Sequence, residues 1–443
     1  MKISKTDRFL FGVALILAVY MPFHVFLSQS LSLVTGGLEV WKAAKDVAIT
    51  VLVPYMLYIA YKRRLFSGVY KWHFALGTLY ILLHLFYVLF STTDDTYSAV
   101  VGSVYNSRLF AYLLLGMLVG SNKRGKEWLK KITTIVVVVA GIVALFGIAQ
   151  YFLPHNMLEN VGYSVDRGVK PMFFIDDKPD FPRVMSTLRD PNSLGAYLIL
   201  PLAMVVVALV KKGANEAMFL RPFRREVLLA LGGILMGALF LTFSRGAMIA
   251  LALSLVAILS IVTGQRVFVF IKKYWLFVAL ILIIISFLSF MFRNSYIFQN
   301  LIFHADQSTV LADPNELRVT LTQQAIDEVV ETPLGHGPGT AGIVSISNPK
   351  GTLLTENYYL QVAYEVGWLG LLALIGLLFL IIKQLLGQRH PVATALLGSF
   401  VGYAFYALLI HLWSNEAIAL QWWLISGVVL GMLANTTKSN ASA

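Results

Sequence analysis

Long apolar runs separated by shorter polar segments extend along almost the whole chain. Uninterrupted runs of about 18 or more mainly apolar residues are typical of transmembrane helices. The pattern predicts an all-α, polytopic integral membrane protein in which residues 1–443 form a single transmembrane domain. Its spans, about twelve in number, are expected near residues 9–27, 45–61, 73–92, 102–120, 132–153, 191–210, 226–243, 246–263, 274–292, 363–383, 391–411 and 418–435.

Lysine and arginine gather in alternate connections between the predicted spans, as in residues 62–64, 123–131 and 221–225. Because basic connections face the cytoplasm and the number of spans is even, both termini are expected in the cytoplasm. The same clustering accounts for the net charge of +12, which in a soluble chain would suggest a nucleic-acid partner. The lipid bilayer is therefore an expected partner, and nucleic acid is not.

Two polar segments on the opposite side are longer than ordinary connections. The first extracytoplasmic loop comprises residues 154–190, and the second, between the ninth and tenth spans, comprises residues 293–362. A long polar loop that is joined at both ends to membrane helices is a suitable place for chemistry on a lipid-borne substrate. The second loop is therefore the expected catalytic loop, with the active site outside the cytoplasm.

The second loop is expected to contain a helix of its own. Asp313 is a good N-cap, Pro314 suits the first helical position, and Glu316 completes a capping box. Apolar residues then recur on one face until about Val330. Arg318 lies in the second turn beside that face, where it could be solvated, paired with Glu316 or available to a phosphate group.

Arg245 lies at the tight outer junction between the seventh and eighth spans. An arginine between two membrane helices is costly unless it is paired or solvated. Its position fits an interfacial arginine whose head reaches water. It also fits an anion clamp, because a guanidinium matches phosphate oxygens bidentately. Gly246 would let a ligand approach the backbone closely.

Two further arginines, Arg183 and Arg189, lie just before the sixth span. That span opens with Asp190 and Asn192. Short polar side chains at such a position are typical helix caps, so these two residues could have a purely structural role.

The segment Gly335–Gly339 is rich in glycine but has neither a Walker lysine nor Rossmann spacing. A shaped loop close to a substrate fits it better than a nucleotide site, and His336 within it could be a base or a hydrogen-bonded loop residue. Glu356 and Asn357 open the tenth span; Glu356 is either an acid favoured by the helix dipole or a general base. No His or carboxylate spacing indicates a metal site, so neither a metal nor a cofactor is expected.

Taken together, these motifs resemble the O-antigen ligase and O-antigen polymerase family of membrane glycosyltransferases. The resemblance covers residues 183–370 and rests on the order of several loose motifs along one topology. They are Pro191-Asn192, Ser244–Gly246 at the start of a span, Arg318 on a loop helix, Pro333–Gly339, and Glu356–Leu360 followed by Glu365–Gly370.

The resemblance implies a GT-C-like, metal-independent, inverting glycosyltransferase of the bacterial cytoplasmic membrane. Its donor would be an undecaprenyl-diphosphate-linked glycan, and its acceptor a glycan or a lipid. By analogy, Arg245 and Arg318 would bind the diphosphate, with Arg183 and Arg189 as further candidates. The substrate cavity would be shaped by the first loop and by Gly337, Gly339, Asn357 and Asn192.

One departure from the family pattern concerns the catalytic base. The family usually has His-Asn where this chain has Glu356-Asn357. A glutamate can do the same work, although its ordinary pKa is about two units lower than that of histidine; His336 and His304 are possible substitutes. A transporter or flippase of lipid-linked glycans is the alternative function, but such carriers tend to have matching halves with broken helices. A non-catalytic membrane scaffold would leave Arg245 unexplained.

Overall fold

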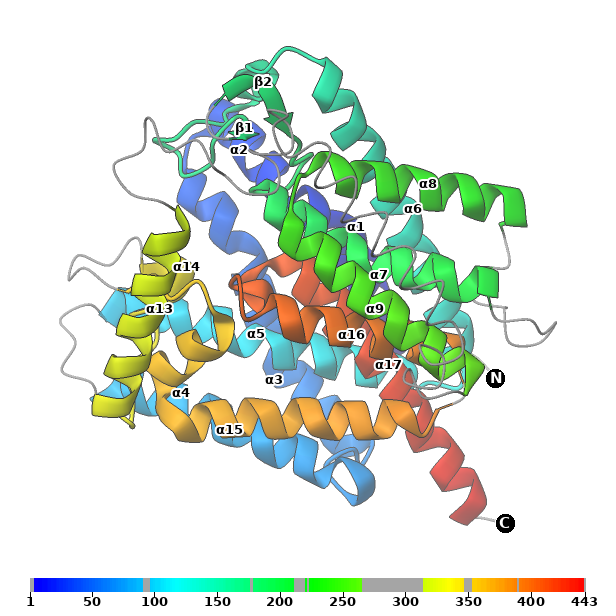
Figure 1. The fold of residues 1–443 in the computed structure, drawn as a ribbon. Coiled ribbons are helices and arrows are strands. Elements are labelled where there is room, and N and C mark those ends of the chain that lie inside the picture. The colour runs from blue at the N-terminus through cyan, green and yellow to red at the C-terminus, as the bar shows by residue number, and fades with distance from the viewer. Residues whose placement is uncertain are drawn as a thin grey trace.

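The computed structural model describes residues 4–90, 96–175, 178–210, 220, 223–264, 314–345, 353–388 and 390–441. Helices make up most of this part of the chain and lie alongside one another (Figure 1). Their bounds are α1 (Lys5–Tyr20), η1 (Met21–Phe23), α2 (His24–Thr35), α3 (Leu38–Lys62), η2 (Gly68–Tyr70), α4 (Lys71–Phe90), α5 (Thr96–Gly120), α6 (Gly125–Phe152), η3 (Met157–Val161), α7 (Pro191–Val210), α8 (Arg225–Leu241), α9 (Arg245–Thr263), α13 (Pro314–Glu331), α14 (Gly342–Ser345), α15 (Tyr358–Leu386), α16 (Pro391–Tyr406), η6 (Leu412–Ser414) and α17 (Glu416–Ala441).

The predicted spans correspond closely to these helices. A helix covers most of every predicted run except the ninth, 274–292, which lies outside the described residues. In the described part, 8 helices are long and apolar enough to cross a membrane. The prediction of an all-α polytopic membrane protein is confirmed at this level, and the number of twelve spans stays a prediction.

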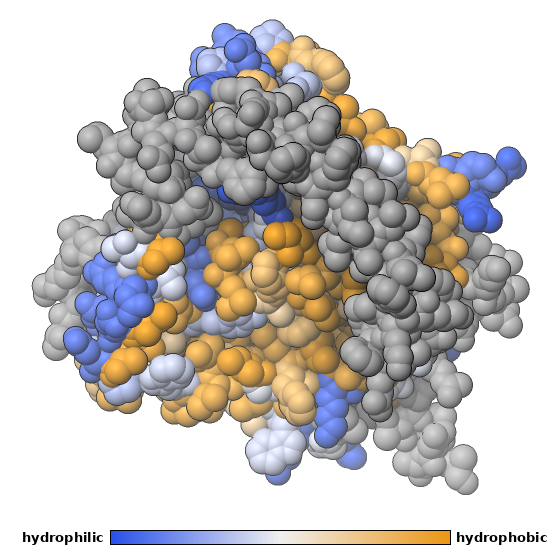
Figure 2. All heavy atoms as spheres, in the orientation of Figure 1, coloured by the Kyte–Doolittle hydropathy of each residue, from blue (hydrophilic) through white to orange (hydrophobic). Residues whose placement is uncertain are grey.

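Apolar and polar side chains occupy different parts of the surface. On the face shown in Figure 2, apolar side chains cover the middle of the helices, whereas polar ones gather over α13 and at the start of α8. The N- and C-terminal ends lie on the same side of the molecule, opposite α13 (Figure 1). This arrangement is compatible with an even number of spans.

Two glycine pairs bring α5 and α17 into backbone contact. Gly116 and Gly120 on α5 face Gly427 and Gly431 on α17, each pair separated by three residues. A Cβ atom on Gly116 would lie only 2.1 Å from the carbonyl oxygen of Leu424. Small residues at this spacing allow membrane helices to pack closely, so α5 and α17 form a tight central pair.

The first long loop, residues 154–190, contains regular structure that the sequence did not predict. It contains a small antiparallel sheet of β1 (Phe173–Ile175) and β2 (Lys178–Arg183), an addition to the all-α expectation. The segment after β2 is fixed to α6, because the side-chain oxygen of Gln150 accepts hydrogen bonds from the backbone of Met185 and Ser186 at 3.1 and 2.9 Å. These bonds place the start of α7.

The helix expected in the second loop is present as α13. Ala325 and Val329 on its apolar face are buried, and the helix packs against α15. The side chain of Arg318 lies outside the described residues. Its phosphate-binding role therefore stays a prediction.

The α5–α17 contact can be tested by adding bulk to one glycine. Gly427→Val should destabilise the protein by about 1–3 kcal/mol, because the new side chain forces two closely packed backbones apart. Gly233→Val on α8 is the matched control, since a Cβ atom at Gly233 would meet nothing within 4 Å. Thermal unfolding in detergent should show a lower Tm for Gly427→Val alone; equal Tm values would contradict the packing.

Candidate functional site

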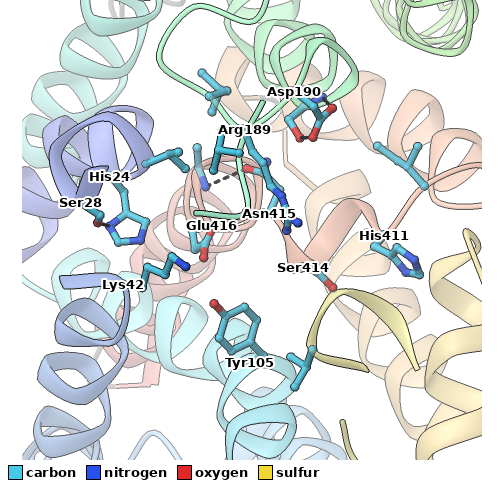
Figure 3. Close-up of a pocket in the computed structure, with 18 of the residues that line it drawn as sticks. His24, Ser28, Lys42, Tyr105, Arg189, Asp190, His411, Ser414, Asn415 and Glu416 are labelled. Atoms are coloured by element: carbon cyan, nitrogen blue, oxygen red, sulfur yellow. Dashed lines mark hydrogen bonds between the residues drawn. The ribbon is translucent and has the colours of Figure 1, made fainter. Parts of the chain in front are cut away.

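A cavity of about 510 Å³ opens between the N-terminal helices, α5, the start of α7 and the segment that joins α16 to α17 (Figure 3). Many of the residues that line it are polar or aromatic. The polar and aromatic residues on it are His24, Ser28, Gln29, Glu39, Lys42, Tyr97, Ser98, Tyr105, Arg189, Asp190, Asn192, Ser193, Glu356, His411, Ser414, Asn415 and Glu416.

Four charged side chains from three helices meet beside this cavity. Lys45 Nζ lies 2.9 Å from Asp46 Oδ2 and 3.2 Å from Glu416 Oε1. Arg108 Nη1 lies 3.3 Å from an oxygen of each of the same two carboxylates. Lys45, Asp46 and Arg108 are almost fully buried, and burial is tolerable for such charges only when they are paired. We call these four residues the charge quartet.

No sequence motif pointed to the charge quartet. The sequence nevertheless places charged residues in predicted spans: Arg108 lies inside one, and Lys45 and Asp46 lie at the start of another. Ionisable residues within membrane spans are rare and often functional. What could not be foreseen was that Glu416, more than 300 positions along the chain from Arg108, would complete the set.

Tyr105 and His24 complete the wall next to the quartet. The ring centroid of Tyr105 lies 4.2 Å from the guanidinium carbon of Arg108, a cation–π arrangement. His24 Nδ1 lies 3.0 Å from the hydroxyl of Tyr20 and 3.3 Å from that of Ser28. In Figure 3, His24 lies close to Lys42 and Glu416 at one side of the cavity.

The predicted residues around the start of α7 lie on or next to the cavity. Asp190 caps the helix: its two oxygens accept hydrogen bonds from the backbone and the hydroxyl of Ser193, at 2.8 and 2.7 Å. Asn192 has a different role, because its side-chain oxygen accepts a bond from Arg183 Nη2 at 3.2 Å. Arg189 and Asn192 line the cavity, and Arg183 reaches it through Asn192.

Arg245 is the first residue of α9 and is not on the described cavity lining. It lies at an adjoining junction: the hydroxyl groups of Ser244 and Tyr406 are 2.7 Å apart, and Tyr406 donates to the carbonyl oxygen of Asn192 at 3.5 Å. A Cβ atom on Gly246 would lie 2.6 Å from the Tyr406 ring. In this structure, close helix packing accounts for Gly246.

Glu356 lines the cavity immediately before α15. Asn357 is the N-cap, since its side-chain oxygen accepts bonds from the backbone of Tyr359 and Leu360 at 2.9 and 3.1 Å. Glu356 itself has φ 44, the left-handed region that residues with a Cβ atom seldom adopt. Such strain often marks a functional position.

The glycine-rich segment encloses a buried carboxylate away from the described cavity lining. Glu365 Oε1 accepts bonds from the backbone of Gly339 and Ala341 at 3.0 and 3.3 Å, and Oε2 accepts one from Asn106 Nδ2 at 2.6 Å. A Cβ atom on Gly339 would lie 2.2 Å from the carbonyl oxygen of Ser98 on α5. Gly339 therefore lets the loop approach α5.

His336 also lies off the described cavity lining. Its ring stacks on that of Tyr364, with centroids 4.1 Å apart, and its Nε2 atom lies 3.3 Å from Glu328 Oε2 on α13. Gly337 donates its backbone N–H to the carbonyl oxygen of Glu365 at 2.9 Å. These contacts describe a hydrogen-bonded loop histidine, and the catalytic assignment of His336 stays a prediction.

His411 is a cavity residue that sequence reasoning missed. Its Nδ1 atom lies 2.9 Å from the side-chain oxygen of Gln361. Burial, and secondarily the nearby charge of Arg189, lower the pKa of His411 to about 4. The imidazole is therefore neutral at physiological pH. No short motif surrounds it in the sequence.

Residues 227–375 match the family model described as O-antigen ligase. We call residues 227–375 the O-antigen ligase domain. This match supports the predicted membership of the O-antigen ligase and polymerase family. No curated protein matches the chain in sequence.

The O-antigen ligase domain supplies only a small part of the described cavity lining. Of the lining residues, Val344, Leu354 and Glu356 lie within the matched segment. The others come from the N-terminal helices, α5, the first loop, the start of α7, the segment that joins α16 to α17 and the first residues of α17. Among the residues that the structure describes, no group of three or more His, Asp or Glu side chains could hold a metal ion.

The anchoring of the glycine-rich loop by Glu365 can be tested with two variants. Glu365→Leu leaves the N–H groups of Gly339 and Ala341 and the amide of Asn106 without their acceptor, so we expect a loss of at least about 2 kcal/mol. Glu365→Gln keeps an acceptor oxygen and should lose less. Thermal unfolding and limited proteolysis of residues 333–345 measure the two effects; equal behaviour of both variants would refute the anchor.

Proposed function

We propose that this protein transfers a glycan from a polyprenyl-diphosphate-linked donor to a hydroxyl group of a glycan or lipid acceptor. The O-antigen ligase domain supports glycan transfer of the ligase or polymerase type in general. The observation that supports the finer proposal is that Arg189 and Glu356 line one cavity. A cation and a carboxylate in one cavity are the groups that a diphosphate leaving group and an attacking hydroxyl require.

The donor side of the proposed reaction depends on arginine. As the glycosyl bond breaks, negative charge grows on the diphosphate, and a fixed guanidinium stabilises that charge more than it stabilises the bound donor. Arg189 lies on the cavity, with Arg183 behind Asn192. Arg245 and Arg318 complete the proposed set, with the diphosphate shared among these side chains.

On the acceptor side, Glu356 is the proposed base. Its carboxylate takes the proton of the acceptor hydroxyl while the oxygen attacks the anomeric carbon from the face opposite the diphosphate. The bond between that carbon and the diphosphate oxygen breaks, its electron pair leaves with polyprenyl diphosphate, and the configuration is inverted. The helix cap at Asn357 and the left-handed backbone at Glu356 fix the point from which the Glu356 side chain extends.

The proposed setting is the outer face of the bacterial cytoplasmic membrane, with both termini in the cytoplasm. The helices are those of a multi-pass membrane protein, and the family match is compatible with an inner-membrane location. The proposed steps use the arginines and Glu356, without a metal ion or an organic cofactor. Residues 293–362 remain the proposed catalytic loop.

The role of Glu356 can be separated from its effect on stability. Glu356→Gln and Glu356→Gly should both lower the rate of glycan transfer about 100-fold or more, because the proton acceptor is lost. Glu356→Gly should also raise the free energy of unfolding, by about 1 kcal/mol, since glycine adopts φ 44 without strain. Release of polyprenyl diphosphate and thermal unfolding, both in detergent, are the measurements. Full activity in Glu356→Gln would remove Glu356 as the base.

The arginine clamp can be tested with two variants, one just before α7 and one at the α8–α9 junction, and a control on α8. Arg189→Ala and Arg245→Ala should lower kcat about 100-fold, because one charged donor to the leaving group is lost. Arg225→Ala is the control: Arg225 is exposed and begins α8, at the end opposite that junction. The rate should be measured with a saturating polyprenyl-diphosphate-linked oligosaccharide. A loss in Arg225→Ala that equals the other two would show a general effect of charge.

A further inference from the structure

One wall of the cavity is built from residues outside the O-antigen ligase domain. Its side chains include the Tyr105 ring, the Glu416 carboxylate, the His24 imidazole and the Lys42 amine (Figure 3). None of these residues lies within the matched segment 227–375. The proposed transfer reaction gives them no role.

The groups on this wall are held rigidly. Glu416 Oε1 is fixed by Lys45 at 3.2 Å and by Arg108 at 3.3 Å. The Tyr105 ring lies against the guanidinium of Arg108, and the His24 ring is fixed through its Nδ1 atom. Because these side chains are already ordered, a ligand would lose little free energy in ordering them.

The charges on this wall cancel. Within the charge quartet, two cations face two carboxylates, and Lys42 Nζ lies 2.7 Å from Glu39 Oε1. A diphosphate would gain little there, whereas a neutral molecule with many hydroxyl groups would find both donors and acceptors. The Tyr105 ring offers an apolar face, which matches the C–H face of a sugar ring.

We propose that Tyr105, Glu416 and His24 form a subsite for one neutral sugar ring of the glycan. Tyr105 packs against the ring face, and Glu416 accepts hydrogen bonds from its hydroxyls. His24 binds a further hydroxyl. The inference rests on the proposed function, because it makes this wall the part of the transferase that selects the glycan. The sugar belongs to either the donor or the acceptor, and separate titrations distinguish the two.

The first test is a pair of substitutions at one position. Tyr105→Ala should raise the KM for either the donor or the acceptor glycan about 10-fold, with little change in kcat. Tyr105→Phe keeps the ring and should stay within about 2-fold of the wild type. Tyr61→Ala is the control, because Tyr61 is 73% exposed near the far end of α3. His24→Ala, which leaves the charge quartet intact, should raise the same KM and serves if Tyr105→Ala does not fold.

The outcomes separate the subsite from the proposed function. If the wild type transfers glycan and neither KM changes in Tyr105→Ala or His24→Ala, the subsite is overturned and the transferase stands. If the wild type transfers nothing, direct binding decides, with the neutral oligosaccharide cleaved from the lipid donor as the probe. Binding by the wild type that Tyr105→Ala weakens about 10-fold supports the subsite; equal binding by both, or none, overturns it.

Discussion

The pairing of buried charges is the constraint on which the cavity depends. Arg108 is buried in the central helix α5, and a lone guanidinium there would cost several kcal/mol. Asp46 from α3 and Glu416 from α17 neutralise it, together with Lys45. The pairing therefore fixes the positions of α3 and the start of α17 relative to α5. The polar wall of the cavity is built from these same groups.

Backbone hydrogen bonds to single side chains fix the loops on the cavity and next to it. Gln150 anchors the segment that leads to Arg189, and Glu365 anchors the glycine-rich loop on α5 and α15. Asn357 caps α15 directly after Glu356. Irregular backbone at membrane depth is tolerated where it is buried in protein and hydrogen-bonded. The loops around the site are thus fixed by a few buried polar residues, each with a defined partner.

Different parts of the chain supply different residues of the cavity. The O-antigen ligase domain brings Glu356 to the cavity and Arg245 to an adjoining junction. Helices α2, α3 and α5 and the start of α17 supply the charge-balanced wall. Under the proposed function, Glu356 and Arg245 of the O-antigen ligase domain act in the transfer chemistry together with Arg183 and Arg189, which lie outside it, and the charge-balanced wall selects the glycan. Such an arrangement would let glycan selection change while the transfer chemistry is kept.

The sequence by itself determined which apolar runs form the described helices and where the loop helix lies, because hydrophobic period acts over a few neighbouring residues. Asp190 could be identified as a helix cap in the same way, and Glu356 as a candidate residue. Tertiary structure decided which side chains share the cavity: it brings Arg189 and Glu356 onto one lining and leaves His336 and Gly339 off it. It also joined Arg108 to Glu416. Contacts between residues hundreds of positions apart depend on how the helices pack. A local sequence pattern does not encode that packing.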